Sequence, residues 1–355
     1  MRRTLVTTGV IVLLAATGWT AGWFVLAGQA RTALNDWAAL RQSSGHDAAW
    51  SSLTLSGFPF TLMARAESVR LSLDTPAGRV AGVFPTLQAR VAVPRLDRVT
   101  LTLPAEQQVS LLGPVGQASH GTARLRDGQI VLTGLGAGGG RATRAMRLTT
   151  ADGTLMSEEQ RVTWTVLDLT VVSREEAPPP ADDPHRGETG RLALHLDGLV
   201  LPPAAGPLHD AGLTRLVMEG RLLGALSSGP PPASLARWSE EGGTIEIDTL
   251  QLVFGDFTMT AAGSLALDGA MQPVGALSLS LINPDRLIDL LVRLSLMNPR
   301  DAQTVKLALA FLTRPDGNGQ RRLEAPLSLQ DGRVRLGPVS LLTLPRLRWV
   351  QSPSE

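Results

Sequence analysis

The chain has 355 residues, of which 43% are hydrophobic and 18% charged, a balance typical of a packed globular protein rather than a disordered one. Its formal net charge is only +1, so no basic surplus points to nucleic acid as a partner. Cysteine and tyrosine are absent, which excludes disulfides, thiolate metal sites, thiol nucleophiles and a tyrosine general acid.

A long uncharged stretch dominates the N-terminus. The residues Leu5–Gly28 carry no charge. As a helix rising about 1.5 Å per residue, this stretch would be about 36 Å long, more than the roughly 30 Å of a bilayer's hydrocarbon core. Arg2 and Arg3 would keep the N-terminus in the cytoplasm, while Trp19 and Trp23 would lie near the outer interface. The pattern predicts a transmembrane anchor at residues 1–30.

A cleaved signal peptide is the alternative reading of the same segment. Gly28-Gln29-Ala30 offers small residues for cleavage after Ala30. However, the uncharged stretch is longer than the apolar region of about 7–15 residues typical of signal peptides. The anchor and the signal peptide both export the rest of the chain, and the remaining reading is a buried soluble helix. We therefore expect a single-pass protein of the inner (cytoplasmic) membrane with its main domain in the periplasm.

Residues 31–50 are predicted to continue the helix beyond the membrane. Leu34, Trp37 and Ala38 recur at helical spacing, and Ser43-Ser44-Gly45 would end the helix.

From Leu53 onward the dominant hydrophobic period is two, as in the alternation of Leu277, Leu279 and Leu281. This period is typical of strands with one buried face. Asp-Gly, a dipeptide that suits tight hairpin turns, occurs six times. The predicted fold is mainly β with a few short α-helices: antiparallel, meandering, curved sheets behind one N-terminal transmembrane helix.

Each Asp-Gly pair can be tested by whether a two-residue loop would place apolar residues opposite each other. Asp331-Gly332 passes, because Leu329 would face Val334. Asp127-Gly128 also passes, and Asp197-Gly198 passes only as far as the next proline. Asp152-Gly153 fails, which predicts a longer turn there.

The body divides into an N-terminal β lobe at residues 51–174 and a C-terminal β lobe at residues 191–355. Between them, residues 175–190 are rich in proline and charge and have no apolar period, which is typical of a linker or flexible loop. The C-terminal lobe contains three segments with helical patterning, which we expect to pack on the sheet: Pro231–Glu241, Pro284–Met297 and Pro299–Leu312.

The sequence contains no convincing catalytic, cofactor-binding or metal-binding constellation. The glycine-rich run at 134–139 matches a dinucleotide-binding pattern, but no helix is predicted after it to hold a pyrophosphate. The histidines lack metal-ligand spacing, and Asp182, Asp183 and His185 lie in the predicted linker. We nominate no catalytic residue, no cofactor and no metal, and we expect that the protein is not an enzyme.

Three segments form a set: WSSLTLSGFPF at Trp50–Phe60, a helix-and-strand stretch from Arg237 to Asp268, and LQDGRVRLGP at Leu329–Pro338. Together they resemble a proteobacterial family catalogued as domain of unknown function 2125. In the first segment Gly57 and Pro59 would end a strand, and Phe58 or Phe60 would fill a core. In the second, Trp238 would anchor a short helix on the sheet.

The plan of an anchor followed by β-sheet is also similar to the wider AsmA-like group of envelope proteins. That resemblance implies phospholipid handling through sheets with an apolar inner face. We therefore expect a non-catalytic envelope protein that binds phospholipid by such a face, with the inner membrane as its other partner. The alternatives are a structural or assembly factor acting through envelope protein partners and, third, an enzyme of unknown type.

Overall fold

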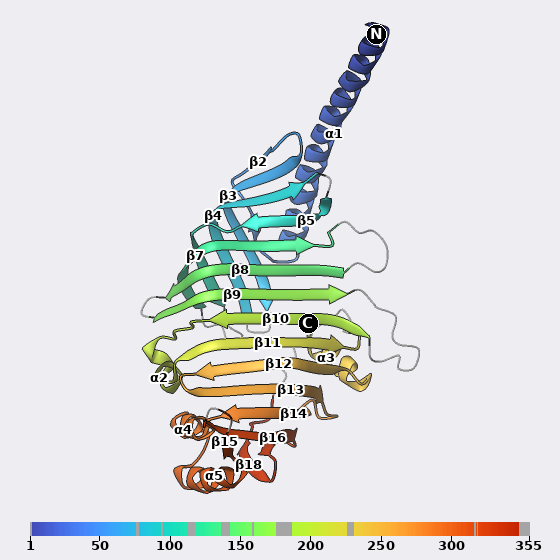
Figure 1. Ribbon diagram of the computed structural model, residues 1–355. Coiled ribbons are helices and arrows are strands. Elements are labelled where there is room, and N and C mark those ends of the chain that lie inside the picture. The colour runs from blue at the N-terminus through green and yellow to red at the C-terminus, as the bar shows by residue number, and fades with distance from the viewer. Residues whose placement is uncertain are drawn as a thin grey trace. The chain divides into compact units, whose positions relative to one another are not determined.

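The computed structural model describes residues 2–75, 78–93, 95–112, 118–135, 143–157, 160–174, 187–225, 231–315, 317 and 319–347. The chain forms two compact units, one of Met1–Ala137 with Thr154–Glu159 and the other of Gly138–Gly153 with Gln160–Glu355. Both units consist mainly of antiparallel strands (Figure 1). The predicted mainly-β fold with a few helices is therefore confirmed.

The first unit contains one long helix and seven whole strands: α1 (Arg2–Ser43), β1 (Ala48–Ala49), β2 (Ser52–Ser56), β3 (Thr61–Thr75), β4 (Gly78–Ala92), β5 (Arg95–Thr102), β6 (Glu106–Leu112) and β7 (Ala118–Thr133). β3 pairs with β1, β2 and β4, and β4 pairs in turn with both β5 and β6. β7 is the next strand of this sheet, and it pairs with the same two strands, β5 and β6.

Helix α1 continues without a break through both helical segments that the sequence predicted, and it ends at Ser43 as expected. Gly45 follows in a left-handed conformation with φ of 75°. The structure describes the side chains of α1 only from Thr17 onward. In that part of the chain, no helix is long and apolar enough to span a membrane.

The predicted hairpin at Asp127-Gly128 is wrong, because both residues lie inside the continuous strand β7. Asp127 alone has a positive φ of 54°, whereas a tight hairpin turn needs two such residues. β7 changes partner here, from β6 before the dipeptide to β5 after it. Leu103 N–H donates to the Gly128 carbonyl at 2.8 Å, so the dipeptide spans the break between β5 and β6. It is a bulge, not a turn.

The second unit contains most of β8 and all the elements that follow it. Its strands are β8 (Thr143–Ser157), β9 (Gln160–Arg174), β10 (Glu188–Asp197), β11 (Leu213–Leu223), β12 (Thr244–Phe254), β13 (Phe257–Leu267), β14 (Pro273–Ile282), β15 (Arg314–Pro315), β16 (Arg321–Gln330), β17 (Arg333–Leu336) and β18 (Val339–Thr343). Its helices are η1 (Pro203–Ala205), α2 (Pro207–Ala211), α3 (Pro231–Glu240), α4 (Asp285–Arg293) and α5 (Pro299–Leu312). Strands β9 to β14 follow one another as neighbours (Figure 1), and β16, β17 and β18 continue the meander.

Of the remaining Asp-Gly predictions, the hairpin at Asp331-Gly332 is confirmed. Leu329 pairs with Val334 as expected, and φ is 51° at Asp331 and 70° at Gly332. The longer turn predicted at Asp152-Gly153 is wrong, since the dipeptide lies within β8. Asp197-Gly198 ends β10, but the chain then passes through η1 and α2 before it returns as β11. A positive φ at one residue therefore serves a bulge or a strand end as readily as a hairpin.

The three helices predicted in the C-terminal half are confirmed as α3, α4 and α5, although α4 ends at Arg293, four residues before the predicted end at Met297. Trp238 anchors α3, because its indole is only 2% exposed and donates to the Leu223 carbonyl at 2.8 Å. Helices α4 and α5 cover one end of the sheet and form its main core. Ile288 of α4 and Leu309 of α5 are fully buried there, against Leu281 of β14 and Leu323 of β16.

The expectation that Phe58 or Phe60 fills a core is wrong: their exposed fractions are 49% and 67%. Trp23 and Ala27 of α1 pack with Leu62 in the small core beside them. The glycine-rich run lies outside the described residues from position 136 onward, and so does the predicted linker from 175 to 186.

Candidate functional site

Cross-strand pairing sorts the side chains of the second unit onto two chemically different faces. Paired residues in antiparallel strands point to the same side, and alternate residues point to opposite sides. One row of partners runs Leu169, Leu194, Met218, Leu250 and Ala261 across β9 to β13. The row continues through Leu279 of β14 to Ala325 of β16.

The neighbouring rows on this side are equally apolar. One joins Leu167, Leu196, Leu216, Leu252, Met259, Leu281 and Leu323. Another joins Val171, Leu192, Gly220, Ile247, Gly263, Leu277, Leu327 and Leu336. We call this side the apolar face. None of the three rows contains a charged or polar side chain.

In the described part of the chain, α4 and α5 cover the apolar face at its C-terminal end. The buried cluster beneath α4 and α5, as far as the structure describes it, draws on β12 to β14 and β16 to β18 and on none of β9 to β11. The part that continues beyond this cluster is the leucine-rich stretch: Leu167, Leu169, Val171, Leu192, Leu194, Leu196, Leu216 and Met218. Its side chains are half-buried, apart from Val171, which is 36% exposed. The stretch is therefore continuous with a buried core but is itself only partly buried.

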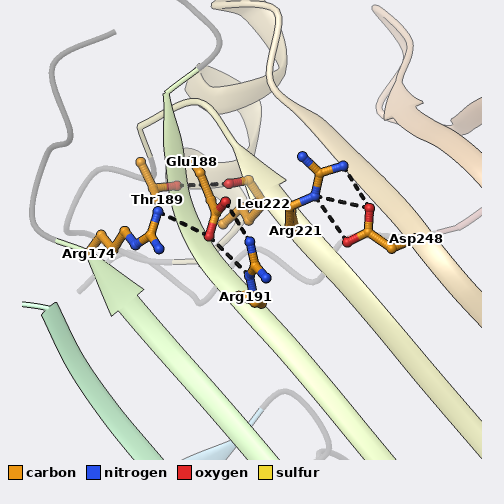
Figure 2. Close-up of polar contacts among 7 residues, drawn as sticks. All are labelled: Arg174, Glu188, Thr189, Arg191, Arg221, Leu222 and Asp248. Atoms are coloured by element: carbon orange, nitrogen blue, oxygen red, sulfur yellow. Dashed lines mark hydrogen bonds and ion pairs between the residues drawn. The ribbon is translucent and has the colours of Figure 1, made fainter. Parts of the chain in front are cut away.

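The opposite face of the same strands carries charge. Arg191 of β10 and Arg221 of β11 are direct cross-strand partners, an arrangement that would be repulsive on its own. Figure 2 shows how carboxylates compensate it: Glu188 accepts from Arg191 Nη2 at 3.0 Å, and Asp248 accepts from Arg221 Nη2 at 2.6 Å. Arg174 adds a second ion pair to Glu188 at 3.3 Å.

These contacts shift the pKa of both carboxyl groups. The hydrogen bond from Arg191 lowers the pKa of Glu188 below its ordinary value, partial burial opposes this, and the charge of Arg174 adds to the lowering. In Asp248, the hydrogen bond from Arg221 is the main cause of a lowered pKa. Both groups are thus held ionised, which suits a structural ion-pair network rather than an acid or base at neutral pH.

A hollow of about 590 Å³ lies where α4 meets the turn between β12 and β13. Phe254, Phe257 and Leu290 form part of its apolar wall, and Arg286 lies at the same site. Arg286 is paired with Asp256 at 3.2 Å, so its charge is already compensated. Arg293 also lines the hollow, which therefore combines an apolar wall at the edge of the apolar face with two arginines, of which Arg286 is already paired with an acid.

The residues considered as chemical groups in the sequence are spread over the two units. His46 contacts Asp74 at 3.0 Å in the first unit, and His209 Nδ1 lies 2.6 Å from the Leu201 carbonyl in the second. His195 lies on the charged face of β10. Asp182, Asp183 and His185 lie outside the described residues. Within the described residues, no three histidine or acidic side chains are grouped so that they could hold a metal ion.

Sequence reasoning identified one-sided strands but missed the extent of the apolar face. The signal was present in the alternation Leu167-Asp-Leu169-Thr-Val171 and in Leu192-Ala-Leu194-His-Leu196. Period two assigns residues to a side within one strand, whereas only the pairing registers show that all strands turn their apolar side the same way.

Comparison with known proteins returns a single relationship. No curated protein matches the chain, and no solved structure matches it. A family model matches residues 23–345, which include the Gly57–Phe60 loop, α3 and the hairpin at Asp331-Gly332. The chain therefore belongs to the family described as an uncharacterized protein conserved in bacteria, domain of unknown function 2125.

Proposed function

We propose that this protein is anchored in the inner membrane by α1, that its β-rich units lie in the periplasm, and that its apolar face binds the acyl chains of phospholipid without chemistry. The uncharged residues 5–28 behind Arg2 and Arg3 support the anchor and its orientation. Because the chain has no cysteine, its folding depends on neither an oxidising nor a reducing compartment.

The leucine-rich stretch is the observation that carries the binding proposal. A soluble sheet ordinarily hides such a face beneath a second layer, as α4 and α5 do for β12 to β14 and β16 to β18. Over β9 to β11 the same face remains half-buried and free of charge. An acyl chain lying across these strands would complete the burial, and each methylene buried contributes about 0.8 kcal/mol.

Photocrosslinking of the full chain in its own membrane tests whether the leucine-rich stretch binds acyl chains. Cells given a fatty acid with a photoactivatable group incorporate it into phospholipid, and irradiation then marks the residues that acyl chains touch. We expect adducts on the leucine-rich stretch as well as on α1. The chain offers a matched pair of variants: Leu194→Glu puts a charge on the apolar face, and His195→Glu puts the same charge on the opposite face of the same strand.

We expect Leu194→Glu to reduce adducts on β9 to β11 about tenfold or more and His195→Glu to leave them unchanged. The thermal unfolding of both purified variants checks that each is folded. Adducts confined to α1 in the unmodified chain would reject lipid binding by the face and leave the anchor intact. Equal labelling of β9 to β11 in both variants would also reject it.

One observation favours the alternative of an assembly factor. Helix α5 exposes Leu307 by 63% and Phe311 by 83%, and the loop before it exposes Leu296 by 56%. Residues four apart lie on one side of a helix, so Leu307 and Phe311 form a single apolar stripe. Such a stripe fits a protein partner in the envelope. Loss of a crosslinked partner on Phe311→Ser, with lipid labelling retained, would favour this function.

A further inference from the structure

Two tryptophans of α1 hold a loop whose aromatic rings face outward. Trp19 Nε1 donates to the Pro59 carbonyl at 2.9 Å, and Trp23 Nε1 donates to the Thr61 carbonyl at 3.0 Å. The ring of Trp23 meets that of Phe58 edge-on at 5.8 Å, and Trp19 lies 6.1 Å from the ring of Phe60. The loop Gly57–Phe60 is therefore fixed along α1 at the level of residues 19–23.

The surface around this contact is apolar and exposed. Phe60 is 67% exposed and Phe58 is 49% exposed, while Phe24 and Val25 on α1 are 63% and 60% exposed. No charged residue occurs from position 48 to position 64 or from position 4 to position 30. The helix and the loop thus bring two uncharged segments together, and a concentration of exposed aromatic rings of this kind marks an interaction surface.

The helix sets the depth of the loop, if α1 crosses the membrane as proposed above. A span needs about 20 residues, and Arg2 and Arg3 prevent it from beginning before position 4 or 5. The earliest span therefore ends near Phe24, about 7 Å beyond Trp19 along the helix axis. A span placed further along the chain would carry the loop deeper. In every placement Phe58 and Phe60 lie at the bilayer's outer boundary or within it.

Several backbone polar groups in and next to the loop have partners that suit that environment. Unpaired backbone carbonyls are costly in or near hydrocarbon. The carbonyls of Pro59 and Thr61 both accept from indole N–H groups, Pro59 has no N–H to satisfy, and Thr61 N–H donates to the Gly57 carbonyl at 3.1 Å. Each tryptophan is in turn satisfied by the loop, so the pair presents rings rather than polar atoms.

We propose that the loop Gly57–Phe60 is a second membrane contact, which inserts Phe58 and Phe60 into the outer leaflet beside α1. The bilayer is its partner because the loop is held against the helix that crosses it. The contact would fix the rotation of α1 about its own axis and hold the start of β3 at the membrane surface. This inference rests on the proposed anchor and is independent of lipid binding by the apolar face.

Single spin labels in the full chain test the proposal, and the absence of native cysteine leaves each label unique. The chain is reconstituted in vesicles of phosphatidylethanolamine and phosphatidylglycerol and labelled at Phe60→Cys, Leu13→Cys or Gln108→Cys. Gln108 is an exposed residue of β6 and serves as the aqueous control. Oxygen, which partitions into lipid, and a nickel chelate, which stays in water, relax each label according to its surroundings.

We expect the label at position 60 to be accessible to oxygen and shielded from nickel, as at position 13, and the label at position 108 to show the reverse. Thermal unfolding of Phe60→Cys verifies that the variant is folded. Lipid exposure at position 13 with water exposure at position 60 would overturn the loop contact alone. Water exposure at position 13 would overturn the anchor itself. Shielding of position 60 from both reagents would overturn the bilayer as partner and indicate a protein contact instead.

Discussion

At the scale of single residues, Glu188 shows how the strands tolerate like charges side by side. Arg191 and Arg221 are cross-strand partners, and Arg174 lies close by on β9. Glu188 pairs with two of these arginines, although its own side chain is only 16% exposed. The carboxylate therefore neutralises a local excess of positive charge at the start of β10. Its protonation would leave that excess uncompensated.

The lowered pKa of Glu188 predicts a loss of stability in acid. A carboxyl group whose pKa is lower in the folded chain than in the unfolded chain stabilises the fold above its unfolded value, about 4.3 for glutamate. That contribution is lost as the pH falls from this value through the folded pKa. We expect Glu188→Gln to lower the melting temperature at pH 7 and to flatten its decline below about pH 4.5.

The control for this prediction is Glu241→Gln, which alters an exposed glutamate after the end of α3. We expect it to leave the melting temperature nearly unchanged, both at pH 7 and below about pH 4.5. If Glu188→Gln shows the same decline in acid as the unmodified chain, the ion pairs at the start of β10 do not contribute to acid sensitivity.

At the scale of elements, the positions and amphipathic faces of α4 and α5 followed from the sequence, while the end of α4 and the role of each Asp-Gly pair did not. Pro299, a helix-starting proline, and the stripe of Val305 and Leu309 correctly predicted α5. Asp331-Gly332 and Asp127-Gly128 passed the same register test, yet only the first is a turn. The difference depends on β5 and β6, partners that a local test does not include.

Helix α5 provides a direct test of which side holds the core. Leu309 is 0% exposed within the main core, and Leu307, two residues earlier, is 63% exposed. We expect Leu309→Ala to lower the free energy of unfolding by about 2–5 kcal/mol, because it leaves a cavity. Leu307→Ala should change it by less than about 0.5 kcal/mol. Chemical denaturation of both variants measures the difference, and equal losses would show that α5 packs by another side.

At the scale of the whole molecule, composition and period predicted a mainly-β chain, and a set of three short segments identified the family that the comparison shows. The apolar face could not be predicted, because its continuity depends on the registers of eight strands. The exposure of Phe58 and Phe60 was also missed, since the sequence alone does not show whether aromatic residues beside a strand end are buried in a core or exposed.

The proposed anchor predicts how the whole protein fractionates. We expect the full chain to remain with the inner membrane through washes with salt and carbonate and to be released by detergent. Protease added from the periplasmic side should digest the β-rich units. A soluble form beginning near Arg31 would contradict the anchor and favour a cleaved signal peptide. Digestion only after the inner membrane is opened would contradict the orientation.

The meander of the second unit also bears on how such a chain can change in length. From β9 to β14 each strand pairs with the strand that follows it and runs in the opposite direction. After gain or loss of a whole hairpin, the strands that follow would still begin at the same edge of the sheet and run in the same direction. Their apolar side chains would still lie on the apolar face. Gain or loss of one strand would reverse everything downstream. Family members should therefore differ in length by pairs of strands, and the apolar face should lengthen or shorten without changing its character.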